Sequence, residues 1–294
     1  MEFGDHRIHI IPDTEFKLDG GAMFGVVPRV IWERVCPADD KNRIAMNMNC
    51  VLIDNGKDKI LIETGIGEKW TDKQLTMYGI ERKRSLADSL KEIAGVSPDD
   101  ITIVINTHLH FDHAGGNTVS TASASMQTPT NVPSADAVGS DIVPQFKNAH
   151  YLVSERELSH AEHPHERDRA SYMPENWRPM IAAGQLEPMP DNYEVIPGLR
   201  MMTERGHSET MQTWRLDSNG RTIYGFADLI PMKHHLPLPY IAGFDLYPTE
   251  TLEFKKRVLP QAVAEDWLCV FYHDLDVPLC RLTEIDGKIK AVGI

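Results

Sequence analysis

Hydrophobic and polar residues alternate along the chain with two periods, one typical of β-strands and one typical of helices. Residues 45–65 hold two β-rich runs on either side of Asn55-Gly56, and this dipeptide between such runs is a strong hairpin signal. Apolar residues recur at helical spacing over 85–94, and an uninterrupted apolar run occupies 101–105. The first third therefore predicts a hairpin, a helix and a buried strand.

The middle of the chain has less regular patterning. Residues 118–142 are mostly Ser, Thr, Ala, Pro and Asn, which predicts a loop insertion, either solvated or folded over a site. Ser154 and Glu157 have the spacing of a capping box, so a helix is expected to begin there. We expect a helical, charged excursion over 154–185.

The last third alternates again between strands and a helix. Strands are predicted at 198–203, 213–216, 222–226 and 267–272, and a helix at 249–264. Strands in both halves, with helices after them, predict a layered α/β protein. We expect one domain over residues 1–294.

Composition and charge narrow the classes of protein and partner. The chain has 294 residues, 41% of them hydrophobic and 25% charged, which is ordinary globular usage. Thirty Lys and Arg against 43 Asp and Glu give a net charge of −13, so nucleic acid and anionic membrane are poor partners. The four cysteines have no CxxC spacing, and no signal peptide or long apolar segment is present. We therefore expect reduced thiols and a cytoplasmic location.

The segment after the 101–105 strand carries the candidate chemistry. His108, His110, Asp112 and His113 lie within six residues and precede Gly115-Gly116. Alternation sends His108 and His110 to one side of an extended chain, and Asp112 and His113 lie where a helix would begin. Imidazole and carboxylate ligands without thiolate indicate a catalytic metal site that accepts Zn, Fe, Mn or Co.

This segment resembles the HxHxDH signature of the metallo-β-lactamase superfamily. The family's later ligands have counterparts in the same order, each after a β-rich run: His207 in Gly206-His207-Ser208, Asp228 after 222–226, and His273 after 267–272. The resemblance covers about residues 45–275. It implies the four-layer αβ/βα sandwich of that superfamily.

The resemblance also implies a division of ligands between two divalent ions, with zinc first among the metals considered. One ion would be held by His108, His110 and His207, the other by Asp112, His113 and His273, with Asp228 bridging. Two ions sharing a hydroxide make a nucleophile at neutral pH, so hydrolysis is the expected reaction. Asp112 is then a ligand and also the candidate catalytic group that accepts or shuttles the proton.

Within the superfamily, the ligand set most resembles the N-acyl homoserine lactonases and the methyl parathion hydrolases, whose relatives are often dimers. We expect a small, apolar ester-type substrate, a lactone first. Phosphotriester or another activated-ester hydrolysis is the alternative, and a non-catalytic metal-binding protein is a second one. Lactonases of this type carry Tyr three residues after the bridging aspartate, where this chain has Pro231.

Several further residues near these motifs have two interpretations each. His234 or His235 could supply the polar contact that the missing Tyr would make, or both could be exposed. Residues 23–28, with Trp32, could line an apolar pocket, pack in the core or form a dimer interface. Glu63 could orient a metal ligand or accept turn hydrogen bonds. Residues 161–166 are interpreted as a solvated loop rather than a separate metal site.

Overall fold

The computed structural model describes residues 1–121 and 141–294, which divide into two compact units. Unit 1 comprises Met1–His6, Glu15–Asn49 and Pro190–Ile294, and unit 2 comprises Arg7–Thr14 and Cys50–Met189. The predicted single domain over 1–294, with its helical excursion at 154–185, stays a prediction. Most of the loop predicted at 118–142 lies outside the described residues.

Two strands supply residues to both units, β2 (His6–Asp19) and β3 (Arg43–Asp54). In unit 2 the strands β4 (Lys59–Ile62), β5 (Ile103–Ile105), β8 (His150–Ser154) and β9 (Leu186–Met189) follow in that order across one sheet. All four run parallel. Their carboxyl ends therefore meet at one edge of the sheet.

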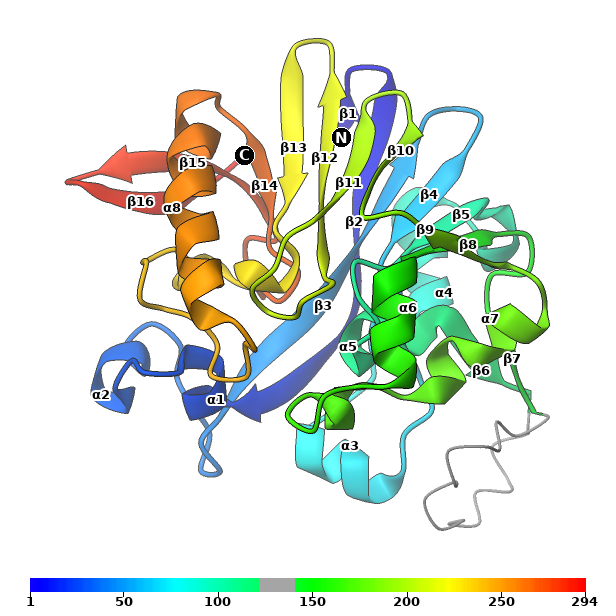
Figure 1. The fold of residues 1–294 in the computed structure, drawn as a ribbon, viewed down its shortest axis with the longest axis horizontal. Coiled ribbons are helices and arrows are strands. Elements are labelled where there is room, and N and C mark those ends of the chain that lie inside the picture. The colour runs from blue at the N-terminus through cyan, green and yellow to red at the C-terminus, as the bar shows by residue number, and fades with distance from the viewer. Residues whose placement is uncertain (122–140) are drawn as a thin grey trace. The chain divides into compact units, whose positions relative to one another are not determined.

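Helices and one small ribbon complete unit 2 (Figure 1). The helices are α3 (Asp72–Tyr78), α4 (Leu86–Ala94), α5 (Phe111–Ala114), α6 (Glu155–Glu162) and α7 (Arg178–Ala182). Short 3-10 turns occupy Pro98–Asp100, Gly115–Asn117, Arg169–Ser171 and Pro174–Asn176, and β6 (Thr118–Ser120) pairs with β7 (Ile142–Pro144). The prediction of irregular structure is therefore wrong at the two ends of the 118–142 segment, where β6 and β7 pair.

Local sequence explains the elements that precede the candidate site. The predicted hairpin is confirmed, because Asp54 pairs with Lys59 across a turn in which Gly56 has φ +85°. The predicted helix is confirmed as α4, whose N-cap Ser85 accepts the backbone N–H of Asp88. Leu90 of α4 is buried in the core of unit 2 with Val104 of β5. Apolar burial therefore fixes β5, the strand that leads into the histidine motif.

Unit 1 contains a sheet in the order β10-β11-β12-β13-β14-β15-β16. Its strands are β10 (Asn192–Ile196), β11 (Leu199–Thr203), β12 (Gln212–Ser218), β13 (Arg221–Gly225), β14 (Leu268–Val270), β15 (Leu279–Ile285) and β16 (Lys288–Gly293), and the two-residue β1 (Glu2–Phe3) pairs in the other sheet. Its helices are α1 (Gly20–Phe24), α2 (Arg29–Trp32) and α8 (Pro248–Ala264), with 3-10 turns at Ala227–Leu229 and Lys233–His235. The four strands and the helix predicted in this third are confirmed within a few residues.

Strand direction in unit 1 matters for the site. β11 and β12 are antiparallel, β12 and β13 are antiparallel, and β13 and β14 are parallel. Strands β11, β13 and β14 therefore run the same way, so the segments that follow them leave the same edge of the sheet.

Helix α8 lies against this sheet (Figure 1), and aromatic rings pack beneath it. Phe254 of α8 lies edge-on to Phe226, with ring centroids 6.4 Å apart, and Phe226 contacts Phe271 at 5.7 Å. All three rings are buried, and their burial contributes to holding the segments after β13 and β14 in place. Among the described residues, none of the helices combines the length and apolar character that crossing a membrane would need.

Candidate metal centre

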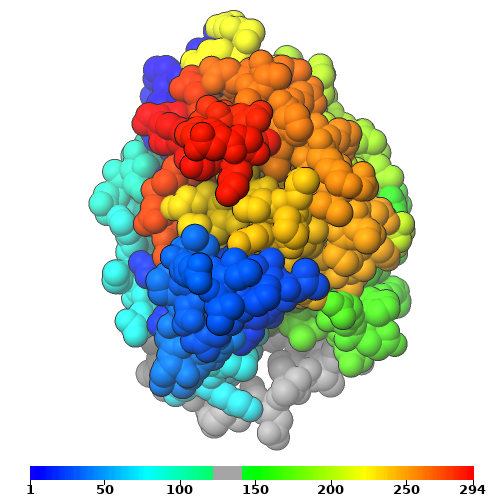
Figure 2. All heavy atoms as spheres, turned by 90° about the vertical axis from the view of Figure 1, so that its left-hand side faces the viewer, coloured from blue at the N-terminus to red at the C-terminus, as the bar shows by residue number. Residues whose placement is uncertain are grey.

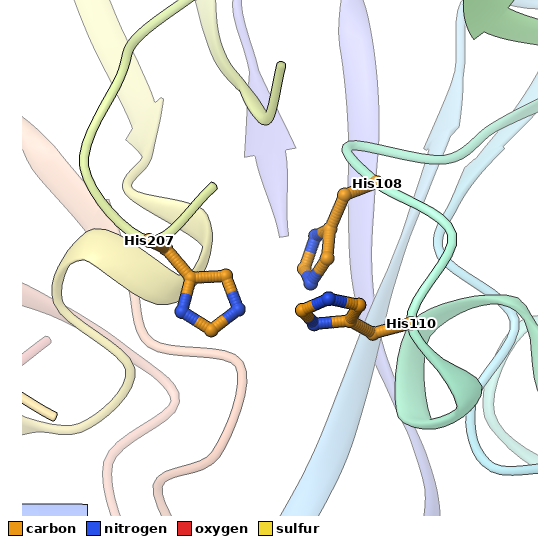
Figure 3. A group of neighbouring side chains, drawn as sticks. All are labelled: His108, His110 and His207. Carbon is orange, nitrogen blue, oxygen red and sulfur yellow. The ribbon is translucent and has the colours of Figure 1, made fainter. Parts of the chain in front are cut away.

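The loop after β5 and the helix α5 that follows it carry four of the predicted ligands, all in unit 2. His108 and His110 are buried on the same side of this loop, with ring centroids 4.5 Å apart (Figure 3). Leu109 points the other way into the core of unit 2. The side chains of His108 and His110 therefore lie on one side of the loop and that of Leu109 on the other, as the sequence predicts.

Asp112 and His113 follow in the first turns of α5. Both are buried, and Nε2 of His113 lies 3.9 Å from Oδ2 of Asp112. The ring of His113 also lies 4.1 Å from that of His108. Burial first, and then the negative charge of Asp112, raise the pKa of the neighbouring Tyr78. The strand-to-helix turn thus gathers three imidazoles and one carboxylate in a small buried volume.

Glu63, directly after β4, accepts a backbone hydrogen bond and also lies beside a predicted ligand, and its role in orienting that ligand stays a prediction. Its Oε1 accepts the backbone N–H of Thr107 at 3.1 Å and lies 3.3 Å from Nδ1 of His113. The side chain is fully buried, and the residue has a φ of +65°. A residue other than glycine is strained at such a positive φ. This backbone conformation directs the carboxylate of Glu63 to the two contacts just described.

Gly115 leaves no room for a side chain beside the loop that follows Glu63. A Cβ at Gly115 would lie 2.2 Å from the carbonyl oxygen of Ile66. Gly115→Ala is therefore expected to destabilise the metal-free protein by about 1–3 kcal/mol, since backbone must move to accept the methyl group. Urea unfolding measures this change. Gly293→Ala, where a Cβ would meet nothing within 4 Å, is the control, and equal midpoints for the two variants would contradict the expectation.

Unit 1 carries the other three predicted ligands, each shortly after one of its co-directional strands. His207 follows β11, Asp228 follows β13 and His273 follows β14. All three are buried. These residues follow β-rich runs at one edge of the unit 1 sheet, as predicted, and their role as metal ligands stays a prediction.

The carboxylate of Asp228 lies between the two imidazoles. Its Oδ2 is 3.6 Å from Nε2 of His207, and its Oδ1 is 3.2 Å from Nε2 of His273. Each oxygen of one carboxylate thus faces a different histidine. This arrangement is compatible with a carboxylate that contacts two cations.

Hydrogen bonds on the far side of each ring fix the histidines. Nδ1–H of His207 donates to Oδ1 of Asp245 at 2.9 Å, and Nδ1–H of His273 donates to the carbonyl of Asn47 at 2.9 Å. In the neutral tautomer these bonds leave the lone pair on Nε2, the nitrogen that faces Asp228. Asp245 was not foreseen, since it lies 38 residues from His207 in a loop without a recognisable motif.

The residues proposed beyond Asp228 have different environments. His235 is fully buried, donates from Nε2 to the carbonyl of Met23 at 2.8 Å, and stacks on Phe24 with centroids 4.9 Å apart. His234 is half-buried, and burial lowers its pKa. The alternative of an exposed histidine pair is therefore wrong. Pro231 accepts the backbone N–H of His273 at 2.9 Å, which ties this segment to a predicted ligand.

Residues 23–28 divide between core and surface. Met23, Phe24 and Trp32 are buried, and Phe24 stacks on Trp32 at 5.3 Å. Val26 is 87% exposed. Figure 2 shows this segment, in blue, lying beside the gold segment that contains His235, where Gly243 N–H donates to the carbonyl of Ala22. Core packing accounts for the large rings, and the pocket interpretation stays a prediction.

The donor set fits divalent metal ions. Each unit contributes buried imidazole nitrogens together with a buried carboxylate, and such nitrogen and oxygen donors suit zinc and neighbouring transition metals. The ring orientations are set by outer hydrogen bonds, as is usual for metal-binding histidines. Elsewhere, His163 and His165 are exposed, which agrees with the solvated loop predicted at 161–166, but the first two residues of that range end helix α6, and Ala161 is buried.

Comparison with known proteins supports the superfamily that the histidine motif resembles. Residues 45–125 match the family model described as the metallo-beta-lactamase superfamily. An N-acyl homoserine lactonase of Bacillus thuringiensis is 25% identical over 248 residues, which cover 77% of this chain and 81% of that protein. A probable metal-dependent hydrolase from Staphylococcus aureus superposes with a TM-score of 0.86 at 27% identity, covering 100% of this chain and 98% of that one.

A second solved structure has the same fold at lower identity. AidC, a dizinc quorum-quenching lactonase, superposes with a TM-score of 0.74 at 17% identity, covering 100% of this chain and 96% of that chain. The chain therefore carries a metallo-β-lactamase superfamily domain, and the predicted fold class is confirmed. The relatives compared are named as lactonases or as a probable metal-dependent hydrolase.

Proposed function

We propose that this hydrolase uses two divalent metal ions to open a small, largely apolar ester, with an N-acyl homoserine lactone as the first substrate to test. The observation that carries the proposal is the carboxylate of Asp228, whose two oxygens face two different buried histidines. Two bound ions could each take one of these oxygens. The similarity to curated lactonases supports the choice of a lactone.

The proposed ligands are two residues of the loop after β5, two residues of α5 and the three residues that follow β11, β13 and β14. The first ion would be held by His108, His110 and His207, the second by Asp112, His113 and His273, and Asp228 would contact both. When bound, the two ions would activate water and polarise the carbonyl or phosphoryl oxygen of the substrate. Metal analysis of purified protein tests this assignment, with zinc, iron, manganese and cobalt all compatible with the ligands.

Asp112 would also handle the proton. It lies in α5, between the predicted ligands His110 and His113. Its carboxylate would accept a proton from the attacking water and then deliver it to the leaving oxygen. Asp112 would act as ligand and as proton carrier.

The reaction test compares two substrate classes at the same site. Metal-loaded protein is assayed with hexanoyl homoserine lactone and with an aryl phosphotriester, and we expect the larger kcat/KM for the lactone. Pro231, which occupies the position of the lactonase tyrosine, favours phosphotriesters as the second candidate. A larger kcat/KM for the phosphotriester would reverse this order. Full metal content without turnover of either ester class would favour a non-catalytic protein.

His234 is proposed to contact the substrate from the segment after Asp228. It is half-buried, and its pKa is lowered first by burial, so it is neutral near pH 7 and able to donate a hydrogen bond. His234→Ala is expected to lower kcat/KM about tenfold, the value of one hydrogen bond of roughly 1.4 kcal/mol. His163→Ala, in an exposed loop, is the control. Unchanged kinetics in His234→Ala would remove this residue from the proposal.

A further inference from the structure

The buried carboxylate of Glu157 lies beside the histidine motif, outside the set of proposed ligands. Glu157 belongs to the first turn of α6 and has no exposed surface. The capping-box spacing predicts that its side chain returns to the N-cap, Ser154. It instead accepts the backbone N–H of Leu109 at 2.7 Å. The carboxylate is therefore directed at the residue between His108 and His110.

Contacts of both its side chain and its backbone therefore fix Leu109 in place. Its side chain is buried in the core of unit 2, and its backbone N–H has a charged acceptor, which makes a stronger hydrogen bond than a neutral one. A buried backbone N–H without an acceptor would cost about 1–3 kcal/mol. With Leu109 fixed, alternation directs the rings of His108 and His110 to the opposite side.

Tyr172 contacts the same loop one residue further on, at His110. Its backbone pairs with His110 in an isolated antiparallel bridge, and its ring meets that of His110 edge-on, with centroids 4.8 Å apart. Burial, followed by the negative charges of Glu157 and Asp168, raises the pKa of Tyr172 well above its usual value, so the phenol stays neutral. The loop is thus held at Leu109 through its backbone and at His110 through its ring.

The geometry points to Glu157 as a positioning residue that sets the direction of His108 and His110 for metal binding. This inference rests on the proposed function only in taking these histidines as ligands. Partners outside the ligand shell change metal affinity by about 10–100-fold. Glu157→Ala is expected to weaken zinc binding by a factor in that range, and Glu157→Gln, whose amide oxygen can still accept from Leu109, to recover most of it.

The experiment uses full-length protein and two readouts. Competition with a chromophoric chelator gives zinc affinity for wild type, Glu157→Ala and Glu157→Gln, with Glu155→Ala, an exposed residue of the same helical turn, as the matched control. Hydrogen exchange of the Leu109 amide is measured in the metal-free proteins. We expect faster exchange in Glu157→Ala than in Glu157→Gln or Glu155→Ala.

The outcomes separate this inference from the proposed function. Zinc affinity in Glu157→Ala equal to that of wild type, or no recovery in Glu157→Gln, would overturn the positioning role. If wild type itself bound no zinc, the proposed function would fail, and exchange at Leu109 would still decide the inference. Unchanged Leu109 exchange in Glu157→Ala would overturn it in either case. If Glu157→Ala fails to fold, Glu157→Gln decides the inference: near-wild-type zinc affinity and Leu109 exchange support it, and a loss of affinity as large as about 10–100-fold with unchanged Leu109 exchange overturns it.

Discussion

Asp228→Asn is expected to lower kcat/KM for the proposed lactone by about 10³-fold, which corresponds to roughly 4 kcal/mol of lost transition-state stabilisation. The side chain keeps its size but loses its charge and one of its two acceptor oxygens. Because Oδ1 and Oδ2 face His273 and His207 separately, the amide can serve only one of them as an acceptor. Steady-state kinetics and elemental analysis of the same preparation measure the effect.

The control for this variant is another Asp→Asn change away from the site. Asp286 is exposed and has a φ of +52° in the turn before Gly287, a conformation that Asn adopts well. Asp286→Asn is therefore expected to keep the activity and metal content of the wild type. Wild-type kcat/KM and metal content in Asp228→Asn would contradict the role proposed for this carboxylate.

The sequence predicts the strand ends of the site because simple periodicity identifies the strands. His207, Asp228 and His273 each follow an apolar run, and the runs became β11, β13 and β14. Their common direction follows from pairing in the sheet, which residue patterns alone do not give. The sequence therefore predicts that the three residues lie at strand ends, and the topology explains why those ends share an edge.

Some strands escaped prediction although one had a clear signal. Asp286-Gly287 joins β15 and β16 in a two-residue turn with positive φ at both positions, the usual composition of such hairpins. The long strand β2 has Pro12 in its middle and charged residues along it, so its composition argues against a strand. Pairing within the sheet outweighs that local preference.

Residues that act on the ligands from a distance were the hardest to predict. Asp245 is hydrogen-bonded to His207 and Asn47 to His273, although the two residues of each pair lie far apart in the sequence. Glu157 had a sequence signal, but the signal indicated a helix cap, whereas its carboxylate bonds to Leu109. Such contacts depend on which elements become neighbours, and no spacing in the primary chain encodes that.

Acid is expected to destabilise the metal-free protein through His235. Burial, the largest cause, lowers the pKa of this histidine from 6.5 to about 3 in the folded chain. Its Nε2–H donates to the carbonyl of Met23, and Nδ1 is buried without a hydrogen-bond partner among the residues that the structure describes. A proton on Nδ1 would therefore be neither solvated nor shared.

The sign of the effect follows from which state binds the proton. Between pH 6.5 and about 3 the unfolded chain protonates His235 and the folded chain does not, so the unfolded state binds more protons and stability falls as the pH is lowered. Two units below 6.5, at pH about 4.5, the loss from this group is about 3 kcal/mol. Urea unfolding of metal-free protein measures it, because bound metal would add its own pH dependence.

His235→Phe separates this contribution from those of other acid-sensitive groups. The phenyl ring can still stack on Phe24, but it cannot titrate and leaves the carbonyl of Met23 without its donor. The variant is expected to be less stable than wild type at pH 7.5 by about 1–3 kcal/mol. It should lose less stability than wild type on acidification to pH 4.5, so the two unfolding free energies converge or cross. His165→Gln, at an exposed position, should follow the wild-type curve, whereas parallel curves for wild type and His235→Phe would show that His235 does not carry the acid sensitivity.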